Sequence, residues 1–391
     1  MEKKITSEER IKITLQHSEP DRVPFDLGST TITGINIDSY KKLLFYLGIE
    51  KKNFPVLYER SGIAEIHEDI LIYLKVDTRG LFPNVYKPAD WAKKRLENKD
   101  YWYIIDEMGV KWRMPKENGH YYDVAENPLK YASKKEDIDN YLWPDFTDSQ
   151  KIDGLEEQAK RIQSETQCAI ILEAPILNIF AFPPFLIGYE NFFLNLASNP
   201  KFACYLMDKM LDFQLQYWEM ALQKLMKYVL IVRMGDDLGT QSSTLISPSM
   251  YRKYVKPRHH KLFSSVKKMT KKKIYIFFHT DGSVYDIIPD LIEVGVDILN
   301  PIQYSAAKMD TKRLKNDFGR ELTFWGGGID TQDILPHKSP RQVKEEVKKK
   351  IDDLAPDGGF VFCPVHNIQY DVPPQNIIAM WEALQEYGRY L

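Results

Sequence analysis

Short hydrophobic runs alternate with amphipathic helical stretches along most of the chain. Each run is nearly continuous and rich in β-branched or aromatic residues, as in strands that are covered on both faces. The runs lie at 22–26, 74–78, 168–173, 229–235, 274–279, 297–301, 322–327 and 359–364. Eight strands that alternate with helices predict a parallel sheet closed into a (β/α)8 TIM barrel.

The segment that follows Ser339 shows the helical pattern most clearly. Ser339 fits the N-cap of a helix, and Pro340 fits its first turn. Hydrophobic residues then recur at helical spacing, at Val343, Val347, Ile351 and Leu354. We expect a helix whose apolar side covers the sheet, with the intervening lysines facing water.

The alternation breaks between about residues 88 and 150. The sequence YWYIIDEMGVKWRM predicts an aromatic-rich hairpin that turns at Glu107, Met108 and Gly109. No repeat or low-complexity linker divides the chain. We therefore predict one domain over residues 1–391, with an insertion after the second strand region.

Composition excludes several classes of function. The 53 Lys and Arg residues against 55 Asp and Glu residues leave no broad basic surface for a nucleic acid. The first residues lack the apolar core of a secretory signal, and no apolar run approaches the roughly 20 residues that span a bilayer. Three scattered cysteines do not form a disulfide framework. A cytoplasmic protein without membrane contact is expected.

Polar residues that directly follow the hydrophobic runs are the first candidates for a reaction centre. In a barrel, the carboxyl ends of the strands converge on one pocket. We predict catalytic roles for Asp236 and His366, and substrate-binding roles for Asp77, Arg79, Asp237, Gln303, Asp330 and Asn367. Asp26, Glu173 and Asn300 follow runs in the same way.

The pair Asp236 and Asp237 has a structural alternative. Adjacent loop residues rarely point in the same direction, so paired acid and base chemistry is not implied by their sequence position. One carboxylate can bind substrate or a loop amide while the other caps the turn at Gly239.

Three residues have the chemistry of a metal site. His279 ends a predicted strand, and Asp281 follows two positions later, where extended backbone points both side chains to one side. With His366 from the last strand, they form a set of two histidines and one carboxylate that suits Zn or Fe. Alternatively, His279 hydrogen-bonds the barrel rim, Asp281 caps the next helix, and His366 is a loop residue without a chemical role.

Several motifs together resemble the uroporphyrinogen decarboxylase superfamily. They are GGFVFCPVHNIQYDVPPQNIIAMWEA at the end of the chain, GGGID before it, PDRVP near the start, and PLKYASKKEDIDNYLWPD in the insertion. The resemblance covers nearly the whole chain, and it implies the same (β/α)8 fold.

The resemblance favours the corrinoid-dependent methyltransferases of that superfamily over its decarboxylases. The decarboxylases carry an arginine-rich segment after the first strand, whereas this chain has DLGSTTITGINIDSY, without arginine. The zinc-dependent methyltransferases bind metal through His-x-Cys and a later Cys. The matching positions here are His279, Asp281 and His366, so the resemblance implies zinc or another divalent metal held by a harder ligand set.

The leading hypothesis is methyl transfer between a small methylated compound and a corrinoid protein. A harder ligand set suits an oxygen ligand, which points to a methoxy donor and O-demethylation. The chain lacks the Asp-x-His-x-x-Gly corrinoid motif, so the corrinoid is expected to arrive on a partner protein. The resemblance is also compatible with a homodimer.

Two other functions remain open at this point. One is decarboxylation of a porphyrinogen-like or other acid, with Asp77 or Asp236 stabilising a protonated ring and His366 anchoring a carboxylate. The other is a non-catalytic corrinoid or tetrapyrrole carrier.

Overall fold

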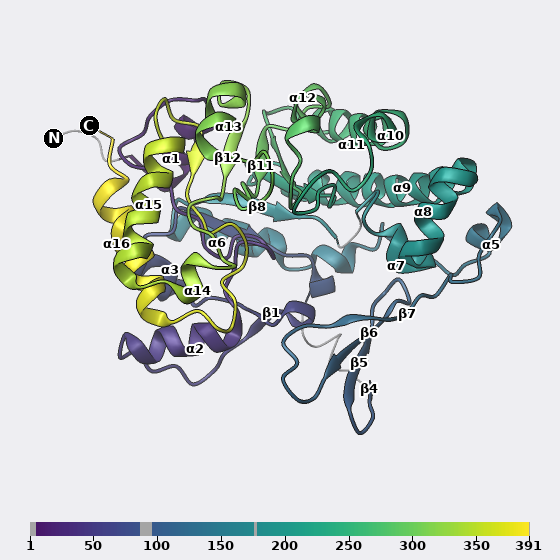
Figure 1. Cartoon of the computed structure of the whole chain (residues 1–391), viewed down its shortest axis with the longest axis horizontal. Helices are drawn as coiled ribbons and strands as arrows, with labels where there is room; N and C mark the ends of the chain where they lie inside the picture. Colours follow the sequence, from purple (N-terminus) through teal and green to yellow (C-terminus); the bar gives the residue numbers. More distant parts are fainter. Residues whose placement is uncertain (1–4, 87–95, 176–177, 391) are drawn as a thin grey trace.

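A seven-stranded parallel sheet forms the centre of the molecule (Figure 1). The computed structural model describes residues 5–86, 96–175 and 178–390. The strands are β3 (Thr78–Leu81), β8 (Ala169–Glu173), β9 (Ile231–Gly235), β10 (Tyr275–His279), β11 (Ile298–Asn300), β12 (Thr323–Trp325) and β13 (Phe360–Val361). They are hydrogen-bonded in chain order. The last six predicted runs, from 168–173 to 359–364, therefore contain the strands that were expected of them.

The first predicted run, 22–26, does not form a regular strand, but its backbone is hydrogen-bonded on two sides. The N–H of Asp26 donates to the carbonyl oxygen of Phe362, which follows β13. The N–H of Asp77, which precedes β3, donates to the carbonyl oxygen of Phe25. This short segment therefore connects to both outer strands of the sheet.

The second predicted run, 74–78, is wrong as a strand assignment. Leu74 caps the helix α3 (Glu68–Tyr73), and Lys75 has a φ of 56°. The strand begins only at Thr78. Leu74 and Val76 are buried, so their apolar character serves the packing of a helix end and turn. As a result, Asp77 lies at the amino end of β3 and not at its carboxyl end.

Helices follow most of the strands and cover the sheet (Figure 1). They are α1 (Ser7–Thr14), α2 (Ile37–Tyr46), α5 (Lys135–Asp139), α6 (Leu155–Glu165), α7 (Pro183–Ile187), α8 (Tyr189–Ser198), α9 (Pro200–Leu225), α10 (Pro248–Met250), α11 (Lys256–Lys268), α12 (Ile288–Glu293), α13 (Thr311–Phe318), α14 (Ile334–His337), α15 (Pro340–Leu354) and α16 (Pro374–Tyr387). None of the helices in the described ranges has the length and hydropathy that a membrane span requires.

The predicted helix after Ser339 is confirmed as α15. The Ser339 hydroxyl accepts a hydrogen bond from the N–H of Gln342, as an N-cap does. The predicted apolar positions are all buried. One intervening lysine differs from expectation, because the Lys350 side chain is buried and its ammonium donates to the hydroxyl of Thr311.

The amino ends of the strands are covered by α1. Its residue Ile11 and the C-cap residue Leu15 belong to the same buried cluster as side chains from β8, β9, β10, β11, β12 and β13. The N–H of Glu8 also donates to the carbonyl oxygen of Gln167, just before β8. Apolar side chains therefore fill this end of the sheet.

A separate antiparallel sheet projects from the main body (Figure 1). Its strands are β4 (Leu96–Glu97), β5 (Tyr101–Ile105), β6 (Lys111–Pro115) and β7 (Asp123–Glu126). The predicted hairpin is confirmed by the pairing of β5 with β6. The Asp106 carboxylate stabilises the turn by accepting from the N–H groups of Met108 and Val110. Residues 88–95 of the predicted insertion lie outside the described residues.

Candidate metal centre

The structure brings His279, Asp281 and His366 together at the carboxyl ends of the strands. Each offers one ligand atom, and these atoms all lie within 4.8 Å of one another. Nε2 of His279 is 3.5 Å from Oδ2 of Asp281, and the two imidazole rings are 5.7 Å apart between centroids. His279 ends β10, whereas His366 lies in the loop after β13.

A hydrogen-bond chain sets the orientation and tautomer of His279. The side-chain amide of Asn300 donates to the carbonyl oxygen of Trp325, which turns its Oδ1 toward His279. Nδ1 of His279 lies 2.8 Å from that oxygen. Since an amide oxygen only accepts, Nδ1 carries the proton in the neutral ring. The lone pair of Nε2 therefore faces Asp281, as in a histidine that is held ready for a metal ion.

The three side chains also interact electrostatically. Burial of His279 opposes its protonated form, but the nearby Asp281 carboxylate outweighs burial and raises the pKa of His279. Burial of Asp281 acts against its charged form, yet the charge and hydrogen bond of His279 lower the pKa of Asp281. The pKa of His366 is lowered, chiefly by burial. Without a metal ion, the Asp281 carboxylate therefore favours a proton on Nε2 of His279, the atom to which a divalent ion would bind, whereas the environment of His366 disfavours protonation.

Beside this centre, the backbones of the loops after β9 and β10 are in close contact. A Cβ atom on Gly239 would lie 2.4 Å from the carbonyl oxygen of Asp281. One on Gly282, whose φ is +84°, would lie 2.6 Å from the carbonyl carbon of Gly239. Only glycine permits such an approach, so these two residues determine where the Asp281 carboxylate lies.

Asp236, predicted to be catalytic, has both carboxylate oxygens occupied by the protein. One oxygen accepts from the backbone N–H groups of Phe180 and Ala181, in the loop after β8. The other lies 2.8 Å from Nε2 of His259. Asp236 is buried, and these contacts fix the loop and leave no oxygen for a substrate. This agrees with the alternative in which one acid of the pair binds a loop amide.

Asp237 points in a different direction from its neighbour. Its carboxylate is 53% exposed and lies 3.9 Å from Nε2 of His279. Desolvation by the surrounding protein raises the pKa of Asp237, and the charge of Asp281 acts in the same direction. The charge of His279 opposes this shift. The structure therefore places Asp237 at the edge of the candidate metal centre.

Three other predicted residues tie together the loops around the centre. Gln303 accepts from the N–H of Gly282 through its side-chain oxygen. One oxygen of Asp330 accepts backbone hydrogen bonds from residues 332–334 at the start of α14. Asn367 accepts from the N–H of Gly34 and donates to the carbonyl oxygen of Thr31. Each has a structural partner, and their predicted contact with substrate remains a prediction.

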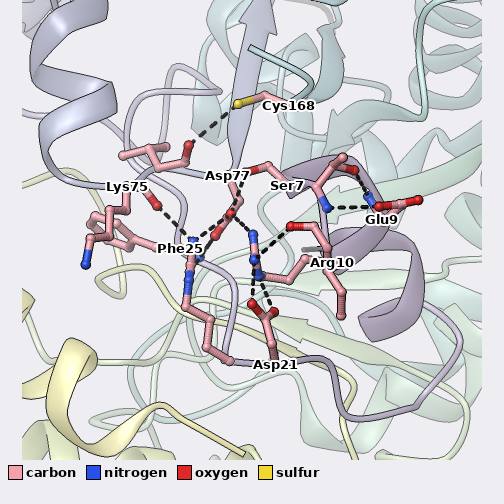
Figure 2. Close-up of polar contacts among 12 residues, drawn as sticks. Ser7, Glu9, Arg10, Asp21, Phe25, Lys75, Asp77 and Cys168 are labelled. Carbon is pink, nitrogen blue, oxygen red and sulfur yellow. Dashed lines mark hydrogen bonds and ion pairs between the residues drawn. The ribbon is translucent and has the colours of Figure 1, made fainter. Parts of the chain in front are cut away.

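Asp77 and Arg79 do not lie at the centre. Asp77 directly precedes β3, at the amino end of that strand. Its carboxylate accepts from Ser7 and Arg10 (Figure 2). Arg79 is paired with Glu68. Their predicted position at the carboxyl end of a strand is wrong, because β3 begins four residues later than the predicted run.

Arg233 is a polar residue near the centre that sequence reasoning missed. It is buried on β9, and its guanidinium lies 3.0 Å from the carboxylate of Glu173. Its charge acts on the pKa values of Asp281 and His366. The available signal was an arginine inside the apolar run VLIVRMG, at an alternate position to Gly235.

The model of the uroporphyrinogen decarboxylase (URO-D) family matches residues 99–387. The chain belongs to the uroporphyrinogen decarboxylase family. The prediction made from its motifs is therefore confirmed.

Relatives of this URO-D family chain include both enzyme types of the superfamily. A methylated-thiol–coenzyme M methyltransferase of Methanosarcina mazei is 22% identical over 274 residues, which cover 68% of this chain and 67% of that protein. A uroporphyrinogen decarboxylase of Thermus thermophilus is 25% identical over 146 residues, which cover 36% of this chain and 38% of that protein. The chain is thus a homologue of a methyltransferase over the longer alignment.

A solved structure of similar fold is the methyltransferase from Methanosarcina mazei. It superposes with a TM-score of 0.63 at 16% identity and covers 98% of this chain and 99% of that one. At this identity the likeness establishes the fold. The α/β fold with a parallel sheet is thus shared with that methyltransferase over nearly the full length.

Proposed function

We propose that this chain is a metal-dependent methyltransferase that moves a methyl group between a small methoxy compound and a corrinoid protein. The observation that carries the proposal is the meeting of His279, Asp281 and His366 with Nε2 of His279 already oriented. These are the positions that the resemblance matches to the zinc ligands of the family's methyltransferases. The longer alignment with a methyltransferase supports the same branch.

The ligand set fits a divalent ion. Zinc binds nitrogen and oxygen at about 2.0–2.2 Å, so two of its tetrahedral ligands are roughly 3.3 Å apart. The 3.5 Å between His279 and Asp281 is close to that separation. His366 is only partly buried, and its ligand atom lies within 4.8 Å of those of His279 and Asp281. Two histidines and one carboxylate suit zinc, iron or manganese.

A divalent ion bound here supplies a Lewis acid for the oxygen of a methoxy donor. The chain's own groups hold that chemistry in place. Asn300 keeps His279 in the ligating tautomer, and the contact between Gly239 and Gly282 fixes the loop of Asp281. When the methyl carbon passes to Co(I) of the corrinoid, the electron pair of the broken C–O bond stays on the donor oxygen. The cobalt chemistry belongs to the partner protein.

Decarboxylation is the weaker alternative. Of the two carboxylates considered for stabilising a protonated ring, Asp77 lies at the amino end of β3, and Asp236 has both oxygens occupied. Neither is available to a ligand at the carboxyl ends of the strands.

The test is metal analysis of the purified chain followed by an anaerobic methyl-transfer assay. We expect about one divalent ion per chain, as in a catalytic zinc site. With a reduced corrinoid protein and a panel of methoxy compounds, the Co(I) absorption should convert to that of methyl-Co(III). Failure to bind Zn²⁺, Fe²⁺ or Mn²⁺ after reconstitution would rule out the ligand assignment. Metal binding without turnover of any donor favours a carrier.

We also propose that the parallel sheet closes into a (β/α)8 barrel through the segment at residues 24–26. The hydrogen bonds from this segment to Phe362 and Asp77 support closure between β13 and β3.

Replacing Asn300 by alanine should weaken metal binding without removing any ligand. The change leaves Nδ1 of His279 without its acceptor, so the ring can rotate or adopt the other tautomer. Loss of such a partner typically costs about 10–100-fold in metal affinity. Competition with a chromophoric chelator measures the change. An unaltered affinity would show that the orientation of His279 is set elsewhere.

Replacing Gly239 by alanine should displace the loop that carries Asp281. The added methyl group would meet the Asp281 carbonyl oxygen at 2.4 Å, so the backbone must shift. We expect a loss of about 1–3 kcal/mol in the free energy of unfolding, together with weaker metal binding. Urea denaturation and chelator competition measure the two effects. Gly154→Ala, at a residue with no atom within 4 Å of its added Cβ but with a positive φ, is the control for backbone strain alone.

A further inference from the structure

Asp237 is the acidic residue at the centre that has no role in the proposed ligand set. Its Oδ1 lies 3.9 Å from Nε2 of His279, and its side chain is 53% exposed. Within the part of the chain that the structure describes, its carboxylate accepts no hydrogen bond. Asp236 beside it is held by three groups of the protein, so the two neighbours differ sharply in what they can still bind.

The backbone of Asp237 is fixed on both sides, although its side chain is free to turn. Asp236 is anchored to the loop after β8, and the N–H of Leu238 donates to the hydroxyl of Thr280. The next residue, Gly239, packs against the backbone of Asp281. Rotation of the Asp237 carboxylate therefore breaks no hydrogen bond and leaves the loop in place.

The position of Asp237 suits a ligand that turns toward a bound ion. It lies outside the group whose atoms are within 4.8 Å of one another. Its 3.9 Å separation from His279 exceeds the roughly 3.3 Å expected between two ligands of a tetrahedral ion. A modest rotation brings its oxygen into the position that the three other ligands leave open.

The charges at the centre favour the same movement. A divalent ion held by two neutral histidines and Asp281 keeps one net positive charge, which a second carboxylate neutralises. When no cation is present, the carboxylates of Asp237 and Asp281, both beside Nε2 of His279, repel each other. A bound ion removes that conflict.

We propose that Asp237 is the fourth protein ligand of the metal in the absence of donor, so that the site then comprises His279, Asp281, His366 and Asp237, and that Asp237 turns away when the donor oxygen takes its position. This inference rests on the proposed metal site. It differs from the sequence-based expectation, in which Asp237 binds substrate. A site with two carboxylates is harder than one with a single carboxylate and discriminates more strongly against soft metals and thiolate acceptors.

The experiment compares Co²⁺ and Zn²⁺ binding by the wild type, Asp237→Ala and Asp333→Asn. Asp333 is a matched control because it also follows a strand of the sheet, is 59% exposed on its side chain, and has its own partner in Lys338. The visible spectrum of bound Co²⁺ reports its coordination, and chelator competition gives the Zn²⁺ affinity. Thermal melts verify that each variant is folded.

We expect Asp237→Ala to retain about one ion per chain but to bind it at least 10–100-fold more weakly, with an altered Co²⁺ spectrum. Asp333→Asn should match the wild type in both measurements. A wild-type affinity and spectrum in Asp237→Ala would overturn the fourth-ligand proposal and leave the three-residue site intact. Absence of metal binding by the wild type would instead defeat the metal site itself, so the two failures are distinguishable.

Discussion

Replacing His279 by alanine is expected to abolish stoichiometric metal binding and to lower methyl transfer by about a thousandfold. The imidazole is almost fully buried, its tautomer is fixed by Asn300, and no other group in the described ranges stands in its position. A metal acting as a Lewis acid contributes several kcal/mol to transition-state stabilisation, and about 4 kcal/mol corresponds to a thousandfold in rate. The folded state should persist, because the removed ring leaves polar neighbours that water can reach.

Elemental analysis and the single-turnover rate with a Co(I) corrinoid protein measure the two effects. His366→Ala should behave in the same way, since it removes the second nitrogen ligand. His337→Ala is the matched control, because that histidine is exposed at the end of α14 and lies outside the candidate centre. Full metal content in His279→Ala, with a normal thermal melt, would contradict the ligand assignment.

Most of the fold was predictable because buried parallel strands leave a strong signal in sequence. Runs such as 168–173 and 274–279 are nearly continuous stretches of apolar and aromatic residues that end in one polar residue, a pattern typical of strands covered on both faces. The prediction of a strand at 74–78 was wrong for a physical reason. Leu74 and Val76 are buried at a helix end, and a short apolar run does not distinguish this packing from a strand.

The candidate site was predictable only for residues whose place in a strand implies the direction of the side chain. His279 ends a strand, and the pleat of extended backbone points it toward Asp281 and His366. The sequence could not assign Asp236 and Asp237 their separate orientations. Those depend on the backbone N–H groups of the loop at 180–181, more than fifty residues away, which hold Asp236 in place. Such long-range partners have no local pattern.

Arg233 illustrates a different limit. A charged residue inside an apolar run was interpreted as part of a strand, and its buried partner Glu173 comes from the neighbouring strand β8. Register between strands determines that pairing. A single sequence shows the alternation of side chains along one strand but not the register between two strands. Only the structure therefore reveals the ion pair.

Replacing Asp77 by alanine is expected to cost about 3–5 kcal/mol in the free energy of unfolding, the largest stability effect predicted for this chain. The Asp77 carboxylate is fully buried and pairs with the guanidinium group of Arg10 (Figure 2). It also pairs with the guanidinium group of Arg22. It also accepts the backbone N–H of Phe25, in the segment that joins both outer strands of the sheet. Alanine leaves the positive charges of the two arginines without this buried carboxylate. It also removes the hydrogen-bond acceptor of the Phe25 N–H, which holds that segment in place. Urea denaturation measures the loss.

The position of Asp77 makes the metal content an independent readout. Because it lies at the amino end of β3, Asp77→Ala protein that remains folded should bind metal as the wild type does. Asp77→Asn keeps one acceptor oxygen for Phe25, so a smaller loss is expected and the variant remains measurable if alanine prevents folding. Asp38→Ala is the control, since its carboxylate is 55% exposed and 3.9 Å from Lys41, and such pairs contribute at most about 1 kcal/mol. Loss of metal in folded Asp77→Asn would instead place Asp77 in the functional site, whereas unchanged stability would mean that solvation of the two arginines replaces the carboxylate at no cost.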